Sequence, residues 1–159
     1  MCLLNFKQIK PEGEITCYKV LMKYIWKDGV SYSSPCYTFH TWEIGKTRTI
    51  PSRQLSGGIM PYIWLCPDEN DKDVEFIGCG AYHTFKNLED AKKLLSLVRE
   101  KFPNKDQGPI TGYALAKCTI PKDSSYVLEG VCNMAGDWRP ESYASEKLRV
   151  DEIIDEPAR

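Results

Sequence analysis

One segment of this chain has the periodicity of a helix, while the runs around it alternate like strands. In residues 87–102, NLEDAKKLLSLVREKF, apolar side chains recur at three- and four-residue spacing, which marks a single buried helix face. These side chains are Ala91, Leu94, Leu95, Val98 and Phe102. Asn87 is a suitable N-cap, and acids in the first turn with bases in the last suit the helix dipole. We therefore predict one main helix near residues 87–102.

The remaining runs predict strands. Residues 15–26, ITCYKVLMKYIW, are rich in residues that favour strands and precede Asp28-Gly29, a pair typical of tight hairpins. Residues 110–121 alternate between small or apolar and larger side chains. Many short strands with one helix predict an α+β fold with a mostly antiparallel sheet. At 159 residues we expect a single domain, 1–159, with a frayed tail from about residue 155.

Composition narrows the class of protein. A hydrophobic content of 42% with 27% charged residues is ordinary for a soluble globular chain, and a net charge of −1 offers no general attraction to nucleic acid or an anionic membrane. No window approaches the ~18 apolar residues of a membrane span. Seven cysteines without a CxxC pair favour a reducing compartment over a disulfide framework. We expect a cytoplasmic protein with no nucleic-acid or membrane partner.

Two similar stretches, CYTFHTW (36–42) and CGAYHTF (79–85), contain the only two histidines. Their similarity stops at seven residues, so an internal duplication is not indicated. Within a strand, a Cys and a His four positions apart are separated by ~13 Å, too far to bind one zinc ion together. We interpret them as two similar strands and predict no metal site.

A candidate ligand site surrounds the second histidine. His83 comes just before the predicted helix N-terminus, where free N–H groups favour an anion, so Tyr82, His83 and Thr84 are candidate ligand-binding residues. Trp138 and Arg139, an aromatic and a cation in the segment GDWRPES, form a second candidate. In the alternative interpretation, Tyr82 or His83 packs in the core with one hydrogen bond satisfied, and Trp138 covers the core.

Three segments of the second half resemble small uncharacterised proteins of phages and gut bacteria. They are GAYHTFKNLEDAKKLL, with Gly-x-x-His-x-Phe leading into a helix; ALAKCTIPKDSSYVLEG, with a strand ending in Ile-Pro-Lys; and YASEKLRVDEII, with a closing Tyr-x-Ser-x-Lys strand. The resemblance covers about residues 78–154 and implies no established reaction. Some proteins of this kind look like ADP-ribosyltransferase-type split sheets, in which a His or Arg, a Tyr and a Glu hold NAD. By that analogy His83, Tyr113 and Glu152 would be catalytic.

Two functional hypotheses follow. The first is a small, non-catalytic binding module without a cofactor, which binds a protein partner or a small-molecule ligand, because no complete catalytic constellation is present. The alternative is an ADP-ribosyltransferase-like enzyme that uses NAD at a site near His83. A His83→Ala variant separates them: loss of nucleotide binding at unchanged stability favours the enzyme. A stability loss of ~1–3 kcal/mol places His83 in the core.

Overall fold

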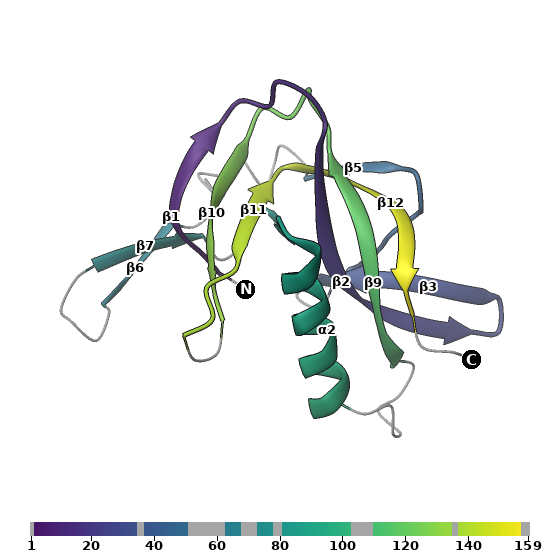
Figure 1. The fold of residues 1–159 in the computed structure, drawn as a ribbon. Coiled ribbons are helices and arrows are strands. Elements are labelled where there is room, and N and C mark those ends of the chain that lie inside the picture. Colours follow the sequence, from purple (N-terminus) through teal and green to yellow (C-terminus); the bar gives the residue numbers. More distant parts are fainter. Residues whose placement is uncertain are drawn as a thin grey trace.

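The computed structural model describes residues 2–34, 37–50, 63–67, 73–77, 81–102, 110–134 and 137–156. It contains twelve strands and the helix α2, shown in Figure 1. The elements are β1 (Cys2–Ile9), β2 (Ile15–Trp26), β3 (Gly29–Ser34), β4 (Tyr37–Thr41), β5 (Thr47–Thr49), β6 (Ile63–Pro67), β7 (Asp73–Ile77), β8 (Tyr82–Phe85), α2 (Leu88–Lys101), β9 (Ile110–Ile120), β10 (Val127–Asn133), β11 (Glu141–Ser145) and β12 (Lys147–Asp155). The predicted α+β class is confirmed. Asn87 occupies the N-cap position of α2 without a side-chain capping hydrogen bond, and Phe102 occupies the C-cap position.

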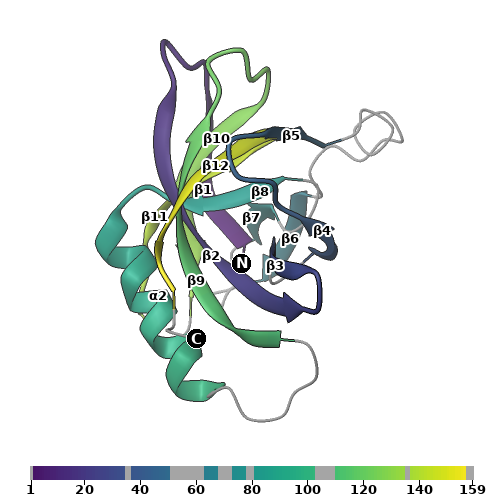
Figure 2. The same ribbon diagram turned by 90° about the vertical axis from the view of Figure 1, so that its right-hand side faces the viewer.

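The strands form one antiparallel sheet. Its order is β5-β12-β9-β2-β8-β11-β10-β1-β7-β6, while β3 pairs with β2 and β4. The central strand β2 runs beside β9 from the pair Ile15↔Ile120 to the pair Tyr24↔Ile110. Figure 2 shows α2 on one side of β2 and β9, with β3 and β4 on the other. At the centre of the sheet, β2 from the first part of the sequence therefore pairs with β9 from its last third.

The central strand is buried on both faces, which explains its nearly continuous apolar sequence. On one face, Val20 packs with Leu115 of β9 against Ala91 and Leu95 of α2. On the other face, Leu21 belongs to a second cluster. That cluster also contains Cys17, Trp42, Ala116, Cys118, Ile120, Val127, Tyr143, Leu148 and Val150. Burial of both faces makes β2 the structural centre of the fold.

A β-bulge interrupts the pairing of β1 with β10. The register shifts between Leu4↔Val131 and Lys7↔Glu129, so Asn5 and Phe6 together face Gly130. Asn5 has a φ of 46°, in the left-handed region. A Cβ atom on Gly130 would lie 2.6 Å from the carbonyl oxygen of Leu4 and 3.0 Å from the Cα of Phe6. The bulge therefore requires glycine at this position.

The residue that follows β12 is held by side chains of β2 and β3. The Glu156 carboxylate accepts a hydrogen bond from the Tyr32 hydroxyl at 2.7 Å and lies 3.1 Å from the Lys23 ammonium. Residues 157–159, in the predicted frayed tail, lie outside the described residues. Within the described ranges, no helix is long and apolar enough to cross a membrane.

Candidate functional site

His83 lies in the core, on β8 between β2 and β11. The residue is 7% exposed, and neither ring nitrogen has a hydrogen-bond partner among the described residues. Burial, together with the positive charge of Lys19, lowers the imidazole pKa from 6.5 to about 3. The Lys19 ammonium donates a hydrogen bond to the His83 carbonyl oxygen at 2.7 Å. The ring is therefore neutral and closed to solvent, which makes it a poor base for an external substrate.

The neighbours of His83 point to the opposite face of the sheet, as strand alternation requires. The Tyr82 ring meets the Trp42 ring edge-on, with the centroids 5.1 Å apart, and Thr84 is fully buried. Tyr82, His83 and Thr84 consequently do not face a common ligand. The packing interpretation describes Tyr82 and His83 better, except that the expected hydrogen bond to the imidazole is missing from the described part.

Trp138 covers the core near the start of α2. Its ring stacks on Phe85, with the centroids 6.2 Å apart, and its Nε1 donates to the Asp90 carboxylate at 3.1 Å. The Lys93 ammonium lies 4.6 Å from the centre of the indole ring, a cation–π contact. Arg139 is exposed and donates to the Met134 carbonyl oxygen at 3.1 Å. Through these contacts, Trp138 packs the segment before β11 against α2.

The three residues suggested by the ADP-ribosyltransferase resemblance lie on different strands. His83 is on β8, Tyr113 on β9 and Glu152 on β12, and β2 and β9 separate β8 from β12. At ~4.8 Å per strand, β8 and β12 are about 14 Å apart when measured along the sheet. Glu152 is exposed and lies 3.5 Å from the Lys117 ammonium. The structure does not bring these three side chains into one site, and their catalytic role stays a prediction.

Two thiols face each other across the centre of the sheet. Cys17 of β2 pairs with Cys118 of β9, and both are fully buried free cysteines. Burial raises the pKa of Cys17 to about 12 and that of Cys118 well above its ordinary value. A thiol reacts as its thiolate, so these two cysteines are core groups rather than nucleophiles.

We expect Cys17 and Cys118 to resist alkylation in the native protein. A short pulse of iodoacetamide at mildly alkaline pH should leave both unmodified, whereas the same pulse in denaturant should modify them fully. Peptide mass spectrometry measures each cysteine separately. Rapid native labelling of Cys17 would contradict the raised pKa and the closed core.

Two pairs of aromatic rings, not expected from the sequence, lie at one end of the sheet. We define the aromatic strip as Tyr24, Trp26, Phe102 and Tyr113. Tyr24 and Trp26 stack with centroids 6.2 Å apart and ring planes at 6°, and the centroids of Phe102 and Tyr113 are 6.5 Å apart. Burial raises the pKa of Tyr113, and its electrostatic interaction with Tyr24 adds to the effect. Met22 of β2 pairs with Tyr113 of β9, so Tyr24 and Tyr113 lie on the same face of these adjacent strands, and the two ring pairs are neighbours on that face.

The two ends of the aromatic strip are its most exposed parts. Trp26 is 53% exposed and Phe102 is 47% exposed, while Tyr24 and Tyr113 are partly buried between them. Figure 1 shows the end of α2 and the beginning of β9 at the same end of the molecule. The signal available in the sequence was YIW immediately before the hairpin turn, where polar side chains are the usual choice.

Comparison with known proteins adds no assignment: no protein-family model, no curated protein and no solved structure matches this chain.

The two histidine-containing stretches fall on β4 and β8, which are not neighbours in the sheet. Cys36, Cys79 and the His40 side chain lie outside the described part, so the distance between the histidine rings is not described. In the described ranges, no group of three or more His, Cys, Asp or Glu side chains is arranged to hold a metal ion.

Proposed function

We propose that this protein is a non-catalytic binding module whose aromatic strip contacts a protein partner. The observation that carries the proposal is the exposure of Trp26 and Phe102, the outer rings of two neighbouring aromatic pairs at one end of the sheet. Aromatic side chains are enriched in protein interfaces, where a few of them supply most of the binding energy. Partly buried rings in the middle of the row hold the exposed ones in place.

The strip is prepared for binding before a partner arrives. Trp26 lies at the end of a strand, and its Nε1 donates to the Ser31 hydroxyl of the adjacent strand at 3.1 Å. Tyr24 is supported by Met22, because its hydroxyl lies 3.9 Å from the Met22 sulfur. Rings that are already ordered lose little conformational entropy on association.

A protein partner suits the strip better than a small ligand. A small molecule gains affinity from a concave site that encloses most of its surface. A row of exposed rings at the end of a sheet offers apolar contact from one side, which matches an apolar segment on another protein. The geometry of the strip gives no comparable support to a small ligand there, and the surroundings of His83 give none to the NAD-using alternative.

Site-specific photo-crosslinking tests the proposal. A photoreactive phenylalanine analogue at position 26 or 102, expressed in cells of the source organism, is expected to give one discrete heavier adduct. The matched control is position 44, because Ile44 is 47% exposed but lies outside the strip. The protein in the adduct is then identified and purified.

Binding of the purified partner gives the quantitative result. Trp26→Ser combined with Phe102→Ser should weaken binding at least about tenfold, the loss expected for interface anchors. An Ile44→Ser variant should bind as the wild type does, and circular dichroism should show all variants folded. Equal crosslinking at position 44, or unchanged affinity of the double variant, would refute the role of the aromatic strip.

A further inference from the structure

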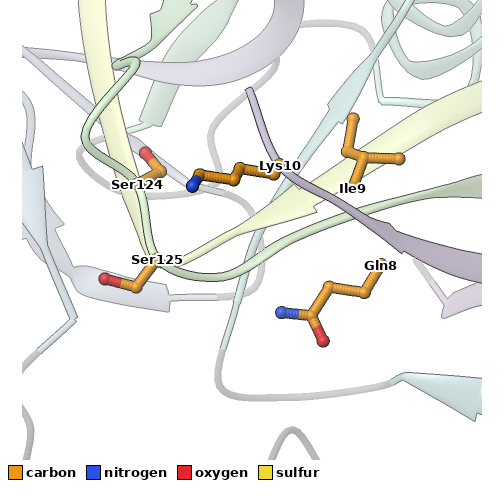
Figure 3. A pocket seen from close by; sticks show the side chains of 5 residues that line it. All are labelled: Gln8, Ile9, Lys10, Ser124 and Ser125. Carbon is orange, nitrogen blue, oxygen red and sulfur yellow. The ribbon is translucent and has the colours of Figure 1, made fainter. Parts of the chain in front are cut away.

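A hollow lies between the end of β1 and the segment that leads into β10. Its volume is about 460 Å³, and its lining consists of Gln8, Ile9, Lys10, Ser124 and Ser125. Figure 3 shows that the Lys10 side chain extends toward Ser124. The hollow is at the opposite end of β9 from Tyr113, because Ser124 follows the last residue of that strand. It is therefore separate from the aromatic strip.

Among the described residues, the lining is rich in hydrogen-bond donors and contains no carboxylate. Lys10 brings a positive charge, Ser124 and Ser125 bring hydroxyls, and Gln8 brings an amide. Two acids beside the hollow each have a partner. The Glu146 carboxylate accepts the Ser125 backbone N–H at 2.5 Å, and the Asp123 carboxylate lies 2.6 Å from the Lys147 ammonium.

Ser124 gives a second, independent indication of a ligand. The residue is 6% exposed, and its hydroxyl has no hydrogen-bond partner among the described residues. Its backbone N–H is already bonded to the Pro121 carbonyl oxygen at 3.0 Å, so the hydroxyl is the group without a partner. Buried polar groups are normally satisfied by protein, water or ligand.

We propose that this hollow binds the phosphate group of a small molecule. The Lys10 ammonium supplies the charge, and the Ser124 and Ser125 hydroxyls donate hydrogen bonds to phosphate oxygens. Several donors around one hollow match the oxygens of a phosphate better than the two oxygens of a carboxylate. The volume exceeds that of phosphate alone, and Ile9 offers apolar contact to the rest of the ligand.

Titration of the full chain with inorganic phosphate tests the site. Amide signals of residues 8–10 and 124–125 in ¹H–¹⁵N spectra are expected to shift and saturate at millimolar concentration, at constant ionic strength. Acetate should shift them less at every concentration. A stronger response to acetate would replace phosphate by a carboxylate and overturn the proposal as stated.

Matched variants connect the response to the named side chains. Lys10→Gln and Ser124→Ala should each weaken phosphate binding about tenfold or more. Lys122→Gln removes the same charge from a nearby exposed lysine outside the lining and should bind as the wild type does. Lys10 is exposed, so its variant is expected to fold normally. Absence of saturable shifts, or equal loss with Lys122→Gln, would indicate a hollow that water alone fills.

Discussion

The free energy of unfolding is expected to fall by roughly 1.5 kcal/mol between pH 6.5 and about pH 5 because of His83. Its ordinary pKa is 6.5, and burial lowers it to about 3 in the folded protein. Well above pH 6.5 neither state binds the proton, so His83 contributes no pH dependence there. Below 6.5 the unfolded chain takes up a proton that the folded chain does not accept until near pH 3. Stability is therefore lost progressively between these two values.

In the upper part of this pH range, the loss of stability caused by His83 does not overlap with the titration of Glu129 and Asp123. Hydrogen bonds from Lys86 and from Lys147 hold the pKa values of Glu129 and Asp123 below their ordinary 4.5 and 3.8. Their contribution to stability is present above those ordinary values and is lost only as the pH falls through the lowered ones. Between pH 6.5 and about 5, these two carboxylates remain ionised in both states.

His83→Leu provides the decisive comparison. The substitution removes the titratable imidazole. It also replaces two buried nitrogens, which have no hydrogen-bond partner among the described residues, with apolar groups of similar size. The free energy of unfolding near neutral pH should therefore be unchanged or slightly higher. Urea unfolding at a series of pH values measures both proteins. His40 is present in both, so their difference reports His83 alone. An equal pH dependence in the variant would show that the imidazole titrates freely and is not buried.

Addition of NAD to the same proteins tests the alternative hypothesis of an NAD site near His83. That hypothesis requires NAD to raise the free energy of unfolding.

The Gly130→Ala substitution is expected to cost roughly 1–3 kcal/mol of folding free energy. The new methyl group would lie 2.6 Å from the Leu4 carbonyl oxygen, and that backbone atom cannot move without disturbing the bulge in β1. Urea unfolding gives the loss, and hydrogen exchange should show weakened protection of the amides of β1. An intact exchange pattern with unchanged stability would mean that the bulge accommodates a side chain.

The matched control is Gly13→Ala, in the turn between β1 and β2. A Cβ atom there meets nothing within 4 Å, so the change should stay within about 0.5 kcal/mol of the wild type. The pair separates a steric effect at the bulge from the general effect of replacing a glycine in the unfolded chain.

Local signals in the sequence predicted local structure well. The helix followed from the periodicity and end charges of residues 87–102, and the structure has α2 at Leu88–Lys101 with Asn87 at the N-cap position. Phe102, expected on the buried face, follows the last helical residue and is 47% exposed. The Asp28-Gly29 pair predicted the hairpin between β2 and β3, and Gly29 has a φ of 135°. Both features depend on neighbouring residues, whose chemistry can be examined without knowledge of the rest of the fold.

Features set by distant contacts were not predictable in the same way. Alternation in Tyr82–Phe85 separates two faces, but only the position of α2 and of the neighbouring strands determines which face is closed over His83. Trp26 is exposed because β9 accompanies β2 only as far as Tyr24↔Ile110, and no local pattern encodes that endpoint. The sequence therefore indicated a candidate site at His83, whereas the exposed rings of Trp26 and Phe102 lie at the ends of β2 and α2.

The arrangement of β2 beside β9 also has a consequence for synthesis on the ribosome. The strand partners Cys17 and Cys118 are 101 positions apart in the chain. At translation rates of about 5–20 residues per second, β2 waits roughly 5–20 s for its main neighbour. During that interval β2 has first only the β3 hairpin beside it, and β8 and α2 follow before β9 is made. Long-range pairing of this kind also folds slowly. The apolar faces of β2 therefore stay incompletely covered until most of the chain has been synthesised.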